Sequence, residues 1–330
     1  MHTRTILMAG GLIILMAVPC PAAEWEKLPP LPEPNGGFAC AALGEVIVVA
    51  GGTNWEGGVK NWLDAIHIFS PKTQSWRQAG RLPSPQAYAV SGVVEDENGW
   101  PQLVIKGGTM GERTVPEWRS LNHGGGQTVM DIAPHPRVLA AGGIVNGWLV
   151  QVGGTNDPAN LAGLVRAALL LKPGDGLIDI LPDYPGAPFG TAACTVAAAE
   201  LFIFGGANWD ASANTVRNAV EAHALHVAKR AWRPLKHLPC PVRGLAAVDL
   251  GNGSLYLAGG YKSDTEGFTA EAWFYDIAKD EYKSAKPLPY SGMVNLVVCK
   301  GHLYCLGGED RQKSRTNACY RIGLPELEVK

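Results

Sequence analysis

The amino-acid sequence predicts an all-β fold, a six-bladed β-propeller, and three observations support this prediction. The 330 residues include 41 glycines and only 18 % charged residues, which suits short buried strands joined by tight turns. Six pairs of adjacent glycines recur along the chain at a nearly constant spacing. The last repeat lacks its final strand, and a segment near the N-terminus has the pattern of the missing strand.

The glycine pairs define the repeat. Each pair closes an apolar run, and successive pairs lie 56, 46, 52, 54 and 48 residues apart: Gly51-Gly52, Gly107-Gly108, Gly153-Gly154, Gly205-Gly206, Gly259-Gly260 and Gly307-Gly308. A period of roughly 50 residues is that of kelch repeats, in which each repeat forms one four-stranded blade. We expect a side chain at these positions to collide with neighbouring backbone or to require a disallowed φ.

A second signal follows the same period. Four aromatic residues are each followed six residues later by Leu-Pro: Trp25, Trp76, Trp232 and Tyr282. We expect each aromatic ring to fill the gap between blades and each proline to end a strand. The second and third repeats lack this aromatic residue. Each repeat is therefore predicted to supply an inner strand, a strand ending in Gly-Gly, a third strand and an outer aromatic strand.

The ends of the chain predict how the ring closes. The last repeat supplies strands at 293–299, 302–306 and 318–322 but no outer aromatic strand. Residues 23–28, which contain Trp25, match that missing strand. We expect this N-terminal strand to become the outer strand of the sixth blade, which removes an open seam in the ring.

The first 23 residues have the pattern of a secretory signal peptide. His2 and Arg4 precede an apolar run at 6–18, and small residues follow it. The run is short for a membrane span, which favours cleavage near Ala23 over the alternative of a membrane anchor. The sequence thus predicts a periplasmic or secreted protein whose propeller occupies residues 24–330, with no membrane attachment after cleavage.

Charge and cysteine content exclude several classes of partner. With 28 basic and 30 acidic residues, the chain gives no electrostatic case for binding nucleic acid or an anionic membrane. The cysteines beyond Ala23 match no zinc spacing, although Cys305 and Cys319 could face each other on neighbouring strands. His223 and His226 resemble a metal pair, but residues three apart on a strand point to opposite faces. We expect no metal and no cofactor.

The loops after the glycine pairs are the predicted binding region. In a propeller these loops converge at one mouth of the central channel, and here asparagine, tryptophan and acidic residues recur in them. Amides beside flat aromatic rings suit a carbohydrate, whose hydroxyls need donors and acceptors while its faces stack on rings. The alternative is that asparagine and aspartate only shape the turns.

Over essentially the whole of residues 24–330 the sequence resembles the N-acetylneuraminate epimerase (sialic-acid mutarotase) family, in the branch whose repeats are cyclically permuted. The segments that carry the resemblance are 34–39, 50–64, 87–92 and 204–209. The resemblance implies an isomerase that interconverts the α and β anomers of sialic acid without a cofactor. The alternative is a non-catalytic kelch propeller that binds a glycan or a protein, and a homodimer is left open.

The resemblance also implies the site residues. The family pairs a glutamate directly after a Gly-Gly strand with an arginine six residues later, which Glu309 and Arg315 match. Glu309 is implied as general base and acid, and Arg315 as a two-point contact for the carboxylate of the sugar. Further lining residues are implied at Asn54, Lys60, Asn208 and Arg217. The family's arginine in the segment matching 188–190 is absent, which leaves another acidic sugar open as the substrate.

Overall fold

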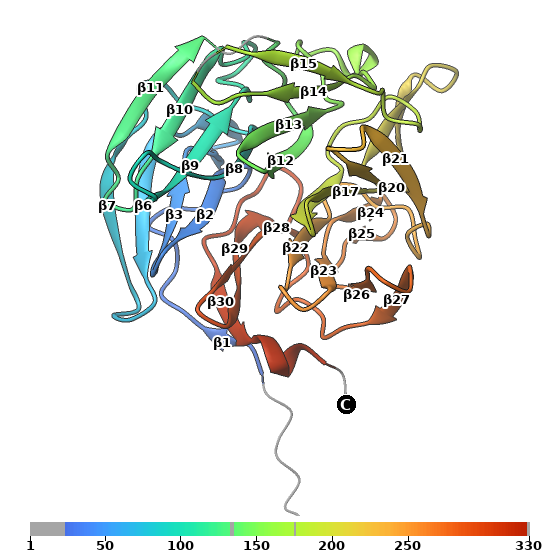
Figure 1. The fold of residues 1–330 in the computed structure, drawn as a ribbon. Helices are drawn as coiled ribbons and strands as arrows, with labels where there is room; N and C mark the ends of the chain where they lie inside the picture. Colours follow the sequence, from blue (N-terminus) through green and yellow to red (C-terminus); the bar gives the residue numbers. More distant parts are fainter. Residues whose placement is uncertain (1–23, 133–134, 175, 329–330) are drawn as a thin grey trace, which may run out of the picture.

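The computed structural model describes residues 24–132, 135–174 and 176–328, and it forms a ring of six antiparallel four-stranded sheets (Figure 1). Within these ranges the helices are two short 3₁₀ segments, Leu161–Gly163 and Leu324–Leu327. None of the described helices is long and apolar enough to cross a membrane. The predicted signal segment, residues 1–23, lies outside the described residues, so export stays a prediction.

Each blade has the predicted order of strands from the channel outward, and the strand bounds follow the glycine repeat. Blades 1 to 3 are β2 (Ala39–Leu43), β3 (Val46–Ala50), β6 (Ala65–Ser70) and β7 (Ser75–Arg81); β8 (Val90–Glu95), β9 (Pro101–Lys106), β10 (Glu117–Leu121) and β11 (Gln127–Ile132); β12 (Ala141–Val145), β13 (Trp148–Val152), β14 (Ala168–Leu171) and β15 (Ile178–Leu181). Blades 4 to 6 are β16 (Ala193–Ala197), β17 (Glu200–Phe204), β20 (Ala222–His226) and β21 (Ala231–Leu235); β22 (Ala246–Asp249), β23 (Ser254–Ala258), β26 (Ala272–Asp276) and β27 (Glu281–Ser284); β28 (Met293–Cys299), β29 (His302–Glu309), β30 (Cys319–Gly323) and β1 (Glu26–Lys27). Separate hairpins follow the glycine pairs of blades 1, 4 and 5: β4 (Thr53–Glu56) with β5 (Val59–Trp62), β18 (Ala207–Asp210) with β19 (Thr215–Asn218), and β24 (Tyr261–Ser263) with β25 (Gly267–Phe268).

The ring closes as predicted, through the N-terminal strand. β1 pairs antiparallel with β30, with Glu26 opposite Arg321 (Figure 1). The Arg321 Nε donates to Glu26 Oε2 at 2.6 Å across this seam. The last blade therefore contains strands from both ends of the described chain.

The four repeated aromatic residues join neighbouring blades by hydrogen bonds. Each donates to a backbone carbonyl just beyond the outer strand of the preceding blade: Trp25 Nε1 to Pro287 at 2.8 Å, Trp76 Nε1 to Pro29 at 3.1 Å, Trp232 Nε1 to Pro182 at 2.7 Å, and Tyr282 Oη to Lys236 at 2.9 Å. The prediction that these rings fill the gaps between blades is confirmed. The polar edge of each ring also satisfies a carbonyl there.

The glycine pairs allow neighbouring blades to approach closely. All twelve glycines have positive φ, which disfavours any residue with a Cβ. At Gly51 an added Cβ would lie 2.1 Å from the Gln86 carbonyl oxygen, in the segment that leads into blade 2. The Gly52 N–H donates to that same oxygen at 2.8 Å. The pair thus serves as the contact point between one blade and the next.

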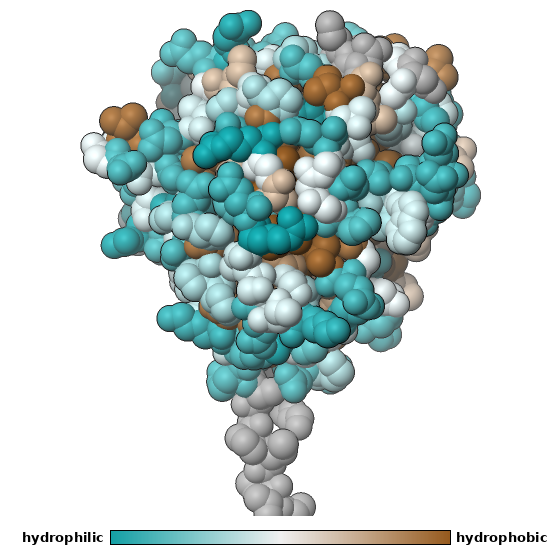
Figure 2. Space-filling model, turned by 90° about the vertical axis from the view of Figure 1, so that its left-hand side faces the viewer, coloured by the Kyte–Doolittle hydropathy of each residue, from teal (hydrophilic) through white to brown (hydrophobic). Residues whose placement is uncertain are grey.

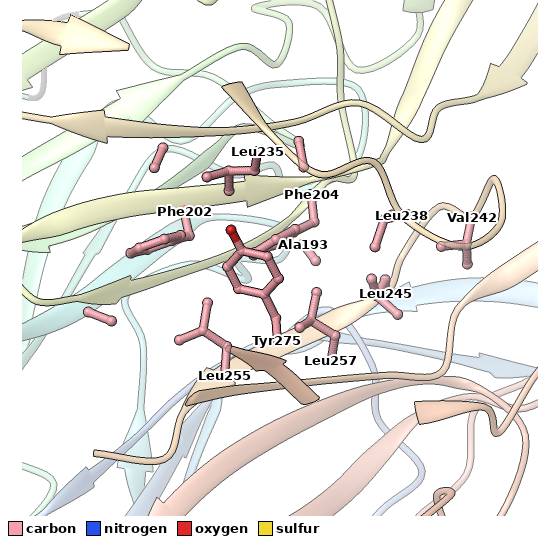
Figure 3. Packing of buried hydrophobic residues seen from close by; sticks show 13 residues of the cluster. Ala193, Phe202, Phe204, Leu235, Leu238, Val242, Leu245, Leu255, Leu257 and Tyr275 are labelled. Carbon is pink, nitrogen blue, oxygen red and sulfur yellow. The ribbon is translucent and has the colours of Figure 1, made fainter. Parts of the chain in front are cut away.

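The surface over blades 1 and 2 is mostly hydrophilic, with hydrophobic residues in isolated spots (Figure 2). The core lies between the blades. Between blades 4 and 5 the Tyr275 ring of β26 packs against Phe202 and Phe204 of β17, with its centroid 5.3 Å from that of Phe204 (Figure 3). Leu255 and Leu257 of β23 belong to the same cluster, and all five side chains are fully buried. Burial of each such side chain stabilises the fold by roughly 1.5–3 kcal/mol, so the interfaces between blades carry much of the stability.

Cys305 and Cys319 do not pair. All six described cysteines are free. The register places Cys305 opposite Tyr320 and Cys319 opposite Leu306. Because successive residues of a strand point to opposite faces, the two thiols lie on opposite faces of the blade. They pack into different clusters, Cys319 against blade 1 and Cys305 against blade 5.

Candidate functional site

A chain of backbone hydrogen bonds surrounds the mouth of the channel. It joins five residues, each two positions before an inner strand: Gly37, Tyr88, Leu139, Thr191 and Gly244, all with positive φ. Each of the last four donates its N–H to the carbonyl of the member before it, at 2.8, 3.3, 3.0 and 3.0 Å. We call these five residues the mouth ring. It holds the inner ends of blades 1 to 5 at a fixed separation.

At blade 6 a different arrangement replaces the mouth ring. Here β28 begins at Met293, which pairs directly with Glu309 at the end of β29. The Arg315 side chain enters beside this pair and packs against blade 1, where a Cβ on Gly36 would lie 2.6 Å from Arg315 Cδ. The absence of a side chain at Gly36 is therefore what makes room for Arg315. The predicted catalytic pair lies at this interruption.

A cavity of about 230 Å³ opens at the mouth and is lined by both polar and apolar side chains. Its ionisable lining residues are Tyr88, Glu309 and Arg315, from blades 2 and 6. Its apolar lining residues come mainly from blades 3, 5 and 6 and include Leu139, Ala140, Leu245, Met293 and Val294. Such a cavity suits a small ligand with an anionic or hydroxyl-bearing end and an apolar end.

Glu309 and Arg315 form a largely buried ion pair. Arg315 Nη1 lies 3.0 Å from Glu309 Oε2, and the two side chains are 4 % and 26 % exposed. Arg315 also donates from Nη1 to Ser314 O at 2.7 Å, from Nη2 to Tyr88 Oη at 2.9 Å and from Nε to Thr53 Oγ1 at 3.3 Å. Among the described residues these contacts leave one N–H, on Nη2, for a ligand. The two-point contact implied by the resemblance therefore requires one of these partners to release the guanidinium.

Burial raises the pKa of Glu309 above its ordinary value, although the positive charges of Arg315 and Lys60 partly oppose this. Removal of the carboxylate from water disfavours its charged form. A glutamate with a raised pKa exchanges protons closer to neutral pH, which suits a group that both takes and returns a proton.

Tyr88 is a site residue that the sequence argument did not assign. Its ring packs over Gly37, where an added Cβ would lie 2.4 Å from Tyr88 Cε1. Its Oη contacts Arg315 and lies 3.2 Å from Thr53 Oγ1. Burial alone raises the pKa of Tyr88, but Arg315 and Lys60 lower it below its ordinary value. Aligning the repeats at the residue two before each inner strand would have found Tyr88 as the ionisable member of that set.

Two of the other predicted lining residues lie on the β4–β5 hairpin. The Lys60 ammonium lies 4.8 Å from the ring centroids of both Trp62 and Tyr88, which places its charge beside the Arg315 cluster. Asn54 lies on β4, where its Nδ2 contacts Glu33 at 3.4 Å and its Oδ1 accepts from Asn61 at 3.0 Å. Neither residue lines the cavity. Lys60 contacts the ring of Tyr88, which does line it, whereas Asn54 has no such contact with the cavity wall.

Asn208 and Arg217 lie opposite each other on the β18–β19 hairpin. Arg217 forms an ion pair with Asp210 and is 75 % exposed. Neither residue lines the cavity, so their contact with a ligand stays a prediction. Thr191 of the mouth ring does line it, and its buried hydroxyl has no hydrogen-bond partner among the described residues. A ligand hydroxyl could satisfy that group.

The histidines of β20 serve structural contacts. His223 Nδ1 lies 3.1 Å from Tyr184 Oη, and His226 accepts from the Lys229 N–H at 3.3 Å. Across residues 24–132, 135–174 and 176–328, no cluster of three or more His, Cys, Asp or Glu could hold a metal ion.

Comparison with known proteins identifies the repeat. Residues 34–83 match the kelch motif. Kelch-like protein 35 of Mus musculus is 25 % identical over 300 residues, which cover 87 % of this chain and 46 % of that protein. Alpha-scruin of Limulus polyphemus is 23 % identical over 289 residues, 83 % of this chain and 30 % of that protein. F-box/kelch-repeat protein OR23 of Arabidopsis thaliana is 31 % identical over 103 residues, 28 % of this chain and 23 % of that protein. The chain spans less than half the length of each of these relatives. It is a six-bladed β-propeller that carries a kelch motif at residues 34–83.

Proposed function

We propose that this propeller is a mutarotase that interconverts the α and β anomers of N-acetylneuraminate at the mouth of its channel. The observation that carries the proposal is the buried Glu309–Arg315 pair, 3.0 Å apart on the wall of the cavity. Its spacing in the sequence is that of the family the sequence resembles.

The chemistry of mutarotation fits these residues. Ring opening needs a base that takes the proton of the anomeric hydroxyl and an acid that protonates the ring oxygen. Glu309, with its raised pKa, serves as the base and returns the proton on reclosure. The positive charges of Arg315 and Lys60 favour a sugar that carries a carboxylate.

A second candidate function is a non-catalytic module that binds a glycan or a protein. The observation that favours it is the nature of the relatives, since Kelch-like protein 35 and alpha-scruin align over 87 % and 83 % of the chain and neither name denotes an isomerase. In this case the loops and hairpins after the glycine pairs form the contact surface, and the Glu309–Arg315 pair stabilises the last blade.

One-dimensional proton NMR of freshly dissolved N-acetylneuraminate tests the proposal, because the anomers equilibrate slowly without a catalyst. We expect the wild-type protein to accelerate equilibration and Glu309→Gln to lose about 10²-fold or more of that acceleration. Asp310→Asn is the matched control, since Asp310 is the next residue but contacts Ser314 and Arg311 rather than Arg315.

We expect Asp310→Asn to keep the wild-type rate. Equal rates with and without protein, or with wild type and Glu309→Gln, contradict the mutarotase assignment. Calorimetry distinguishes the second candidate, because a binding module gives heat with the sugar or a glycan but leaves the anomer equilibration unchanged.

A further inference from the structure

The backbone of Tyr88 belongs to the mouth ring, but its side chain is unlike those of the other members. Leu139 and Thr191 share its left-handed conformation, with φ of 61° and 53° against 57° for Tyr88. The ring geometry therefore explains the backbone. The ring geometry does not explain the side chain. Tyr88 places an ionisable phenol on the wall of the cavity, whereas the corresponding residues of blades 1 and 5 are glycines.

The hydrogen bonds of Tyr88 leave its proton available. A guanidinium only donates, so the phenol oxygen accepts from Arg315 Nη2 at 2.9 Å. Thr53 Oγ1 donates to the Gly36 carbonyl at 3.1 Å and can accept from the phenol at 3.2 Å. The phenol proton thus has an acceptor in the free protein and can turn to a ligand oxygen in the cavity.

The charges around Tyr88 stabilise its deprotonated form. Lys60 faces it from β5 and Arg315 from the loop before β30, while the carboxylate of Glu309 is paired with Arg315. Although burial raises the pKa of Tyr88, these two cations lower it overall. Tyr184, Tyr256, Tyr261, Tyr275, Tyr282, Tyr290 and Tyr304 all have a raised pKa instead.

We propose that Tyr88 is the catalytic acid that protonates the ring oxygen of the sugar while Glu309 acts as the base. This role rests on the mutarotase function proposed above. Tyr88 and Glu309 both contact Arg315 and line the same cavity, so a single pyranose can touch both. Arg315 holds the two groups in place.

The step balances without any further reactant. The Glu309 carboxylate takes the proton of the anomeric hydroxyl, whose O–H electrons form the carbonyl as the bond from the anomeric carbon to the ring oxygen breaks. The ring oxygen takes the phenol proton and becomes a hydroxyl, which leaves a phenolate beside Lys60 and Arg315. After rotation about the adjacent carbon–carbon bond, the hydroxyl attacks the other face of the carbonyl. Its proton returns to Tyr88, and Glu309 protonates the carbonyl oxygen.

Substitution of Tyr88→Phe tests the role, because it removes one oxygen and keeps the ring over Gly37. We expect kcat to fall by about 10²-fold or more, with little change in KM. Since the acid must be protonated, the wild-type rate should fall as pH rises through the pKa of Tyr88. This alkaline limb of the pH–rate profile should disappear in Tyr88→Phe. Tyr261→Phe is the control, since Tyr261 lies on the β24–β25 hairpin and contacts Asp264.

A titration of tyrosinate absorbance gives a readout that does not depend on activity. We expect one phenol of the wild-type protein to ionise below the ordinary value of about 10. Tyr88→Phe should lose this signal, and Lys60→Met should move it to higher pH. A wild-type titration with no early phenol overturns the proposal.

The two proposals fail in different ways. An active wild type with an equally active Tyr88→Phe, or with an unchanged alkaline limb, overturns the role of Tyr88 alone. A wild type that does not accelerate equilibration overturns the mutarotase function and this role with it, and the early phenol then remains as a property of the site without that reaction.

Discussion

Lys106 is a basic residue that lies in the core between blades 2 and 3. It is fully buried, and its Nζ donates to Gln151 Oε1 at 2.7 Å and to the His135 carbonyl at 3.1 Å. Burial, assisted by the charge of Arg137, lowers the pKa of Lys106 to about 7. The amine is therefore largely neutral in the folded protein at mildly alkaline pH.

This pKa predicts how stability depends on pH. Between about pH 7 and the unfolded value of about 10.4, the unfolded chain holds a proton on Lys106 that the folded chain lacks. The contribution of Lys106 to stability therefore rises with pH across that window, by at most about 1.4 kcal/mol per unit. Urea unfolding gives the free energy of unfolding of wild type and of Lys106→Met. The value for the variant minus that for wild type should fall from pH 7 to pH 9.5. Exposed Lys72→Met is the control, and parallel pH curves for wild type and Lys106→Met would contradict the prediction.

Alanine substitutions at two glycines distinguish the cost of backbone strain from the cost of a steric clash. Gly44 and Gly51 both have positive φ, 66° and 68°, but only Gly51 has neighbours where a Cβ would lie. We expect Gly44→Ala to destabilise the fold by about 1 kcal/mol. Gly51→Ala should cost at least 2 kcal/mol more, roughly, because the Gln86 backbone must move. Denaturant midpoints measure the difference in stability between the two variants. Equal losses of stability would contradict the prediction, because they would show that the contact of Gly51 with the Gln86 backbone does not add to the cost.

The resemblance implied Glu309 and Arg315 through a short local spacing, and the structure brings the two side chains together. It did not imply Tyr88, because the predicted binding region was the loops after the glycine pairs, whereas Tyr88 precedes an inner strand. Asn208 and Arg217 resembled Asn54 and Lys60 in their repeat positions, yet only Lys60 reaches the cluster. The Lys60 contact is made with Tyr88 of the next blade, and the pattern of a single repeat does not encode contacts between blades.

The blades that lack the repeated aromatic residue use polar contacts instead. Between blades 1 and 2 the buried Arg119 donates to Ser84 O at 3.0 Å and to Gln86 Oε1 at 2.9 Å. Between blades 2 and 3 Arg137 donates to Gly153 O at 3.2 Å, next to Lys106. The repeat pattern marked these blades as divergent. It could not give their replacements, because each bond joins residues 16 to 35 positions apart, and no recurring spacing marks them.

The outer strand of the last blade should depend on Trp25. Its ring packs into the cluster around Leu327 and Ile322, and its Nε1 bonds the Pro287 carbonyl. We expect Trp25→Ala to destabilise the protein by about 1–3 kcal/mol through lost packing and an unpaired carbonyl. Trp100→Ala, at a tryptophan that is 59 % exposed, should change stability by less than about 0.5 kcal/mol. Thermal unfolding compares the two, and equal shifts would show that the seam contributes nothing.

At the scale of the whole molecule, the ring could be predicted because its signals are periodic. The glycine pairs gave the number of blades, and the unmatched last repeat gave the closing strand. The polarity of the mouth could not be predicted in this way. Its charged side combines Lys60, Tyr88, Glu309 and Arg315 from blades 1, 2 and 6, and only the closed ring brings these residues together.

The pairing of β1 with β30 also determines when the site can form during synthesis. Arg321 follows its partner Glu26 by 295 residues, so β1 is made long before the strand that it pairs with. Until then its edge is open to wrong partners, and late long-range pairing of this kind slows folding. Glu309 and Arg315 lie in the same late segment. A nascent chain that has completed five blades therefore contains Tyr88 and Lys60 but not the Glu309–Arg315 pair, so its candidate site is incomplete.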